Sequence, residues 1–377
     1  MKPLFIILLL IAFTASLTSR ISNRGFFAHF DLEGNILILP TPTPPVFNST
    51  LLKMAAVDTG EAGLKQEIED ILKTDREFTD GGGYWTSDSP RRRFSQQEVR
   101  VTSSKVIPEF KRVLRNWAEK QRYGGNIMTE LVKLVKHRID EHNGSVGSDS
   151  KYNSCAVVGN SGILLKKEYG RLIDSHEVVI RINNAKTENF ERNVGSKTSI
   201  SFVNSHILNE CSTKERRGCY CQPYAENVPT VMYICQPLHL LAYTQCNWTR
   251  NAPTIVTDGR FDVLSSRIVK YYSLKRFVEE EGKRAEEWAA AHDNEFFHYS
   301  SGMQAVLLAL GVCEKASLFG FGKWVSAKHH YHSEQRTEIR SHDYEAEYAF
   351  YGDLVNNTWG VPFITGEFKF PPVVIYQ

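Results

Sequence analysis

"CAVVGNSGILLKKEYGRLIDSHEVVIRINNAKTENFERNVGSKTSISFVN", residues 155–204, contains the pattern that decides the fold. It holds three short runs of apolar, mostly β-branched residues, and each run ends in Gly or Asn. Further runs of this kind are "TVMYIC", "PTIVTDG" and "KASLFGFG", and helical patterns at 261–280 and 302–310 alternate with some of them. Continuous apolar strands that alternate with helices predict an α/β fold with a mainly parallel, buried sheet.

The turns that close these runs are the first places to look for chemistry, because ligands bind at the carboxyl ends of the strands in such sheets. The first turn is "GNSG", residues 159–162, whose glycines would let backbone N–H groups approach a phosphate. Its spacing is not the GxGxxG of a dinucleotide site. Asn160 and Ser161 are equally suited to capping the next helical turn, so both interpretations stay open on this evidence alone.

A longer set of fixed spacings continues from this turn. It includes Gly170, the run 173–176, the triplet 181–183, Ala185 and the segment 194–198. In this order and spacing the stretch closely resembles the large motif of the sialyltransferase family, and the chain is similar to the plant sialyltransferase-like members.

The other three motifs of that family follow in order. "HYSSGMQAVLLALGVCEKASLFGFG", residues 298–322, resembles the small motif. The third motif is matched by His330-Tyr331-His332 and the very small motif by His342-x4-Glu347. The resemblance therefore covers the chain from residue 155 onward, and nothing before about residue 100 adds to it.

The resemblance implies a variant GT-A-like fold: a single α/β/α domain with a Rossmann-like sheet that binds a CMP-activated sugar. It also implies an inverting transfer of an acidic 2-keto-3-deoxy sugar, sialic acid or a Kdo-like acid, to a hydroxyl of a glycan or cell-wall polysaccharide. No cofactor or metal is expected, since CMP-sugar is the donor substrate. The sequence agrees in containing no Asp-x-Asp pair; Asp293-x-Glu295 is the nearest imitation.

Two histidines receive catalytic roles from the resemblance. His342 matches the general base, which suits a side chain whose ordinary pKa of ~6.5 lies near working pH. His330 matches the histidine that contacts the donor phosphate. Glu347 is expected either to orient His342 or to support its loop.

The resemblance implies a nucleotide site formed by residues that follow three of the strand runs and by the turn at the start of the helical pattern at 302–310. Arg181 and Asp174 are interpreted as structural, tying strand to helix. The residues expected to bind the nucleotide are Asn160, Asn183, Ser300, Ser301, Gly302 and Gly322.

Seven cysteines are present, and none forms a CxxC zinc pair. The resemblance implies a disulfide between Cys155 and Cys313, which is expected to hold the two nucleotide-binding turns together. The pairing of the other five is not predicted. They lie at Cys211, Cys219, Cys221, Cys235 and Cys246.

The amino terminus predicts entry into the secretory pathway. "PLFIILLLIAFTASL" after Met1-Lys2 is an apolar run that fits either a cleaved signal peptide or an uncleaved type II signal anchor within residues 1–19. The expected location is the Golgi membrane, with the catalytic domain in the lumen. Four glycosylation sequons agree with this compartment, at Asn48, Asn143, Asn247 and Asn356.

The predicted organisation has three parts. After residues 1–19, residues 20–100 are expected to form a Pro-rich stem and a polar linker with one short helix at 63–72. Residues 101–377 are expected to form the catalytic domain. The formal net charge of the 377-residue chain is +2, which gives no reason to expect a nucleic acid partner.

Three positions depart from the family pattern near the expected sugar: His298, Tyr299 and Ser333. The donor sugar is therefore left open between sialic acid and a Kdo-like acid. Two other functions also stay open. One is a non-catalytic lumenal glycan-binding homologue of the same fold, and the other is a metal-dependent hydrolase built on His329, His330, His332 and His342.

Overall fold

The computed structural model divides the chain into two compact units, residues 1–45 and 46–377. In the first unit, β1 (Ala28–Phe30) and β2 (Ile36–Ile38) form an antiparallel pair. None of the helices in the described part of the chain is long and apolar enough to cross a bilayer. The predicted signal segment, residues 1–19, lies outside the described residues. These are residues 28–30, 36–38, 47–58, 61–73, 83–85, 99–101, 105–145, 147–213, 227–246, 251–292, 297–324, 326–335, 337–356, 360–364, 366 and 368–377.

The centre of the second unit is a parallel sheet of seven strands, in the order β11-β10-β5-β6-β7-β8-β9. All residues of β5, β6, β8 and β10 are buried. The predicted α/β class with a mainly parallel, buried sheet is confirmed. The strands are β5 (Cys155–Val158), β6 (Val178–Ile182), β7 (Ile200–Asn204), β8 (Thr230–Tyr233), β9 (Thr254–Val256), β10 (Ala316–Phe319) and β11 (Val373–Tyr376).

The strand order changes direction between β5 and β10. From β5 the chain adds β6, β7, β8 and β9 on one side, and it then returns through helices to add β10 on the other side. β5 and β10 pair in register, with Val158 opposite Phe319, and the N–H of Gly159 donates to the carbonyl of Phe319 at 2.8 Å. The turns after these two strands therefore leave the sheet side by side, at the position where ligands bind in sheets of this type.

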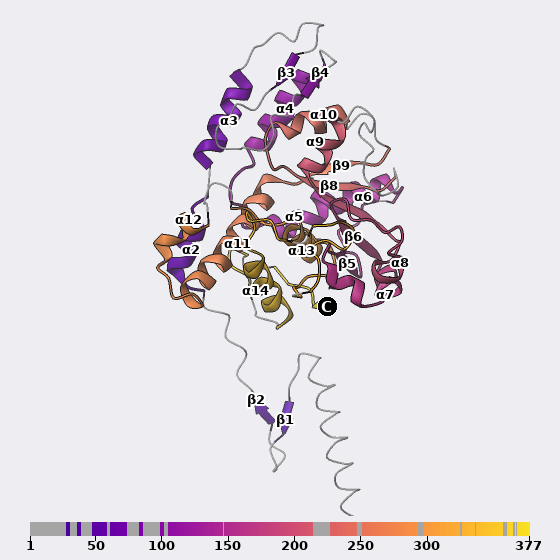
Figure 1. Ribbon diagram of the computed structural model, residues 1–377, viewed down its shortest axis with the longest axis vertical. Helices are drawn as coiled ribbons and strands as arrows, with labels where there is room; N and C mark the ends of the chain where they lie inside the picture. The colour runs from indigo at the N-terminus through magenta and orange to yellow at the C-terminus, as the bar shows by residue number, and fades with distance from the viewer. Residues whose placement is uncertain are drawn as a thin grey trace, which may run out of the picture. The chain divides into compact units, whose positions relative to one another are not determined.

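Helices cover both faces of the sheet, because alternate strand residues point to opposite faces. Val157, Ile180 and Phe202 belong to the core cluster that includes α13 (Ser301–Val312) and α11 (Gly259–Glu279). Figure 1 shows these two helices beside α14 (Tyr344–Val355). The opposite faces of the same strands pack on two further clusters, which gives three layers, α/β/α.

The remaining elements of the second unit extend these layers. On the α13 side lie α5 (Ile127–Leu131), the π-helix η1 (Val132–Lys136) and α6 (His137–His142). The other face carries η2 (Gly162–Lys166), α7 (Gly170–Asp174), α8 (Glu191–Val194), α9 (Ser205–Thr213), α10 (His239–Cys246) and α4 (Val106–Ala118). The short elements η3 (Ala285–Glu287) and α12 (Trp288–Ala291) follow α11, and β3 (Gly83–Trp85) pairs antiparallel with β4 (Val99–Val101).

Part of the expected stem belongs to the second unit. In α2 (Ser49–Ala55), Leu51 and Ala55 are buried against the main core, and Asp58 pairs with Arg267 of α11 at 3.0 Å. α3 (Glu61–Lys73) includes the predicted helix at 63–72 and packs on α4. The prediction that residues 20–100 form only a stem and linker therefore differs from the structure here. The reason is that these helices carry apolar residues at helical spacing, which can be buried.

The disulfide between Cys155 and Cys313 is present, with the two Cα atoms 6.0 Å apart. It joins the first residue of β5 to the end of α13, so it lies at the opposite end of both elements from the nucleotide-binding turns. The expectation that it holds the two turns together is wrong. The disulfide joins the start of β5 to the end of α13, so it affects the turns only through the length of these two elements. Cys246 is also disulfide-bonded.

Candidate active site

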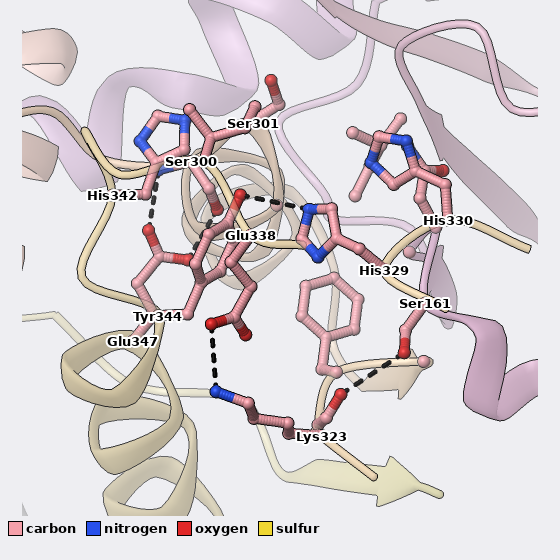
Figure 2. A pocket seen from close by; sticks show the side chains of 18 of the residues that line it. Ser161, Ser300, Ser301, Lys323, His329, His330, Glu338, His342, Tyr344 and Glu347 are labelled. Atoms are coloured by element: carbon pink, nitrogen blue, oxygen red, sulfur yellow. Dashed lines mark hydrogen bonds and ion pairs between the residues drawn. The ribbon is translucent and has the colours of Figure 1, made fainter. Parts of the chain in front are cut away.

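A cavity of about 640 Å³ lies at the carboxyl ends of β5, β6, β7 and β10. Figure 2 shows side chains from the two strand-end turns, the start of α13 and the segment before α14 pointing into it. Every residue predicted to act in catalysis or nucleotide binding lines this one cavity. They are Asn160, Asn183, Ser300, Ser301, Gly302, Gly322, His330 and His342.

The start of α13 forms one wall. Ser300 is the N-cap of this helix, and its Oγ accepts from the N–H of Met303 at 3.1 Å. Ser301 and Gly302 form the first turn and line the cavity. Because the N-terminus of a helix carries partial positive charge and unpaired N–H groups, this wall suits a phosphate.

The two asparagines are used differently. Asn160 has a buried Oδ1 without a partner in the described structure, so it can accept a hydrogen bond from a ligand. Asn183 adopts φ 55°, a conformation that Asn tolerates better than most residues. Its Nδ2 donates to Ser301 Oγ at 3.1 Å, and its Oδ1 accepts from the N–H of Asn204 at 3.1 Å. Asn183 thus links the ends of two strands to the start of α13.

His342 has the geometry of a general base. Its Nδ1 lies 2.7 Å from the carbonyl oxygen of His298, which can only accept, so Nδ1 carries the proton and Nε2 keeps its lone pair. Burial lowers the pKa of His342 from its ordinary value, and the hydrogen bond to His298 partly opposes that shift. The imidazole is therefore neutral at neutral pH and able to accept a proton.

Glu347 supports the loop rather than His342. Its carboxylate accepts from the N–H of Ser300 at 2.7 Å, from Ser300 Oγ at 2.5 Å and from the hydroxyl of Tyr351 at 3.2 Å. Burial raises the pKa of Glu347 to about 7, against the effect of these three hydrogen bonds. Of the two roles expected for Glu347, the contacts identify the second: it fixes the start of α13.

His330 is held by stacking. Its ring lies between those of His329 and His332, with centroid distances of 4.6 Å and 5.3 Å. Burial, with smaller contributions from His329 and His332, lowers the pKa of His330 to about 4. Without a ligand His330 is therefore neutral at neutral pH. A phosphate beside it would raise this pKa, because a nearby negative charge favours the protonated imidazole.

Sequence reasoning missed several polar residues of the cavity wall, among them Lys323, Glu338 and Asn204. Lys323 Nζ lies 3.0 Å from Glu338 and 3.1 Å from Glu345, so its charge is largely offset. Asn204 also lines the cavity, and it could have been found because it ends strand β7 as Asn183 follows β6. Lys323 and Glu338 carried no comparable signal, since they meet only through the path of the loop between them.

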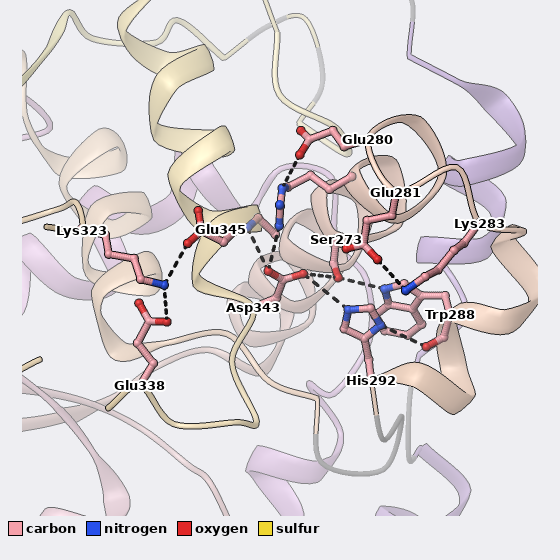
Figure 3. A network of polar contacts seen from close by, with 12 residues as sticks. Ser273, Glu280, Glu281, Lys283, Trp288, His292, Lys323, Glu338, Asp343 and Glu345 are labelled. Carbon is pink, nitrogen blue, oxygen red and sulfur yellow. Dashed lines mark hydrogen bonds and ion pairs between the residues drawn. The ribbon is translucent and has the colours of Figure 1, made fainter. Parts of the chain in front are cut away.

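Asp343 connects the segment between His342 and Glu347 to α11 (Figure 3). One carboxylate oxygen accepts from the N–H of Ala346 at 3.1 Å and caps α14, and the other accepts from Ser273 Oγ at 2.6 Å. Arg276 lies 3.4 Å from the same carboxylate and His292 lies 3.7 Å from it. Asp343 therefore fixes the chain between His342 and Glu347.

Two further predictions concern residues outside the cavity. Asp174 accepts from the N–H groups of Ser196 and Lys197, and buried Arg181 donates from Nε to the carbonyl of Lys197 at 3.0 Å. Asp174 ties the end of α7, and Arg181 ties β6, to the turn before β7, as their structural interpretation predicted. Among the described residues, which include all four histidines of the alternative hydrolase, no group of three or more His, Cys, Asp or Glu is placed to hold a metal ion.

A helix start suited to a phosphate and a histidine with the geometry of a general base lie together at the switch point of a parallel sheet, an arrangement that fits a group-transfer enzyme. The family model for glycosyltransferase family 29 (sialyltransferase) matches residues 94–359, so the chain belongs to this family and is a glycosyltransferase. The predicted family resemblance is confirmed.

Two relatives and one solved structure illustrate the range of similar proteins. The beta-1,6-galactosyltransferase GALT29A of Arabidopsis thaliana is 49% identical over 100% of this chain and 99% of its own length. Sialyltransferase-like protein 3 of Oryza sativa subsp. japonica is 48% identical over 71% of this chain and 75% of its own. The crystal structure of a mammalian sialyltransferase aligns with a TM-score of 0.40 and 22% identity, covering 73% of this chain and 85% of that one.

Proposed function

We propose that this glycosyltransferase moves a sugar from a nucleotide-activated donor to a hydroxyl of a glycan, with inversion and without a metal. The observation that carries this proposal is the hydrogen bond from His342 Nδ1 to His298, which leaves Nε2 free to accept the hydroxyl proton. The hydroxyl oxygen attacks the anomeric carbon and forms the glycosidic bond while the bond to the phosphate breaks. The proton goes to His342, and the electron pair leaves with the phosphate, beside the start of α13 and His330.

For the donor, galactose is our first candidate. It is supported by the full-length relative named as a galactosyltransferase, which is 49% identical to this chain. At Lys323 the cavity wall suits a neutral sugar, because the charge of Lys323 is offset by Glu338 and Glu345. Arg340, which also lines the cavity, is a group with which the sugar carboxylate of the second candidate could pair.

The second candidate is the donor that the motifs imply, a CMP-linked sialic acid or Kdo-like acid. It is supported by the four sialyl motifs and by relatives named as alpha-2,3-sialyltransferases, of which the Gallus gallus protein is 32% identical over 47% of this chain. The acceptor in either case is a glycan, with a cell-wall polysaccharide as the more specific expectation.

We also infer that the enzyme acts in the Golgi lumen, anchored as a type II protein by residues 1–19, with residues 101–377 as the catalytic part. This inference is supported by the apolar amino-terminal run and the four sequons. Of the sequon asparagines, Asn48, Asn143 and Asn356 are described, and Asn247 lies outside the described residues. Asn48 and Asn143 are exposed, as glycan attachment requires.

The donor is tested by incubating the purified full-length chain with UDP-galactose, CMP-sialic acid and CMP-Kdo in separate reactions. Nucleotide release and transfer to a panel of galactan and pectic acceptors are measured, each with and without a chelator. We expect transfer from UDP-galactose that survives chelation. Transfer only from a CMP-linked acid would replace galactose by the second candidate, loss of activity with chelator would refute metal independence, and no turnover or binding of any donor would refute the catalytic role.

A further inference from the structure

A second cavity, of about 360 Å³, lies at the carboxyl end of the edge strand β9, away from the residues assigned to transfer. Its wall combines α4, α10, η1 and the starts of α6 and α11, and Figure 1 shows α4 and α10 close together beside β9. The floor is apolar, with Leu131, Phe261 and Leu308. The volume is within the range of small-ligand sites.

The rim of this cavity is aromatic and basic. Trp117 and Tyr243 supply two aromatic rings, and Asn116 supplies an amide. Lys133 and Arg138 are exposed there, and neither has a carboxylate within ion-pair distance in the described part of the chain. Aromatic rings beside unpaired cations and an amide suit a sugar ring that carries a negative charge.

Two further observations point to a ligand. Trp117 is only 7% exposed, and its indole N–H has no acceptor among the described residues. Buried indole N–H groups are normally hydrogen-bonded, so this unpaired donor at the cavity wall is suited to a ligand oxygen. Residues 133–135 of the wall belong to the π-helix η1, a rare distortion that is frequent at functional sites.

The position of the cavity relates it to the transfer site. Asn204, at the end of β7, lines the first cavity, and Val256, at the end of β9, lines the second. Because only β8 lies between these strands, the two strand ends are about 10 Å apart at the same edge of the sheet. A short oligosaccharide is longer than this separation of the strand ends.

We propose that the cavity beside β9 binds an acidic sugar residue, a hexuronate, of the acceptor glycan while another residue of the same chain receives the transferred sugar. This inference rests on the proposed function, because it assumes a glycan acceptor. The uronate carboxylate lies against Arg138 and Lys133, the sugar ring packs on the aromatic rim, and a sugar oxygen accepts from the indole of Trp117.

The test measures binding rather than turnover, in the full-length chain carrying His342→Ala so that no transfer occurs. The probes are a glucuronosyl-galactobiose and the neutral galactosyl-galactobiose, titrated by calorimetry with the nucleotide site saturated. We expect the acidic probe to bind about tenfold more tightly than the neutral one. Arg138→Gln should remove this preference, since one charge-assisted hydrogen bond corresponds to roughly tenfold or more in affinity.

Arg115→Gln is the matched control, because Arg115 is exposed on α4 but does not line the cavity, and it should keep the preference. Trp117→Phe keeps most of the ring and removes the N–H, so it should weaken both probes severalfold. Equal binding of the two probes, or a preference that survives Arg138→Gln, would overturn the proposal, as would full competition by inorganic phosphate. If no donor supports transfer in wild type but the acidic probe binds as described, the proposed function fails and the binding site stands.

Discussion

The two histidines of the active site are held in different ways. The ring of His342 is fixed by a hydrogen bond to the carbonyl of His298, and the chain after it is fastened to α11 through Asp343 and to α13 through Glu347. The segment around His330 is anchored by its backbone and by Tyr331, whose N–H donates to the carbonyl of Asn160 at 2.8 Å. Among the described residues, the ring of His330 makes no hydrogen bond and stacks on two other imidazoles.

This difference matches the two roles proposed for these histidines, general base for His342 and phosphate partner for His330. A general base needs one defined tautomer before the acceptor arrives, and a fixed carbonyl acceptor supplies it. A group beside a leaving phosphate benefits from a protonation state that changes with the ligand. Burial, with smaller contributions from the two stacked histidines, keeps His330 neutral without a ligand, and a bound phosphate reverses that preference. The following predictions test this contrast, beginning with the largest expected effect.

Removing His342 should abolish transfer and leave nucleotide binding nearly intact. We expect His342→Ala to lower kcat roughly 10³-fold, because general base catalysis contributes that order of magnitude. In the wild-type enzyme, kcat should fall on the acid side at a pH below ~6.5, since burial lowers the pKa of His342. Initial rates from pH 5 to 8 and calorimetric titration with nucleotide measure both quantities.

His332→Ala is the control for this variant, because His332 is another half-buried histidine that does not line the cavity. It should keep most of the rate. Activity of His342→Ala close to that of the wild type would show that another group takes the hydroxyl proton, and an equal loss in His332→Ala would mean that the loop, not the base, was lost.

Removing the carboxylate of Glu347 should destabilise the fold. Because Glu347 fixes the start of α13, its loss should also disturb the proposed nucleotide site. Glu347→Ala leaves the buried N–H of Ser300 unpaired and opens a cavity, which we expect to cost about 2–3 kcal/mol of the free energy of unfolding. Glu347→Gln keeps an acceptor for that N–H, so its loss should be below about 1 kcal/mol. Urea unfolding measures both variants, and equal losses would contradict this role.

The wild type and Glu347→Gln also test how the free energy of unfolding depends on pH. The folded pKa of Glu347, about 7, lies above the unfolded value of ~4.3, so the folded state retains a proton that the unfolded state releases. The contribution of Glu347 is therefore complete below ~4.3 and is lost as the pH rises to about 7. Glu347→Gln should remove this part of the decline in the free energy of unfolding with pH. An unchanged slope between pH 5 and 7 would assign the decline to other groups.

The contrast also separates what the sequence could predict from what it could not. His342, Asn160 and Ser300 were found because family spacing and the strand-end rule point to the same edge of the sheet. The partner of Glu347 depends on how α14 packs against the start of α13, and no local pattern shows that packing. The pairing of Cys155 with Cys313 was predicted correctly from the family resemblance. Its effect was not, because that depends on which ends of β5 and α13 carry the two cysteines. The cavity beside β9 draws its wall from segments spread over residues 113–308, so it has no motif.

The smallest effect is expected at His330. Because a bound phosphate raises its pKa from about 4, donor affinity should increase as the pH falls from 8 to 5.5. The measurement uses UDP-galactose and His342→Ala protein, in which neither transfer nor titration of His342 interferes. Adding His330→Gln should weaken binding by about tenfold at pH 5.5 and make it independent of pH, whereas His332→Gln should keep the pH dependence. A pH dependence that persists without His330 would place the proton elsewhere and remove the distinction between a fixed base and an adaptable phosphate partner.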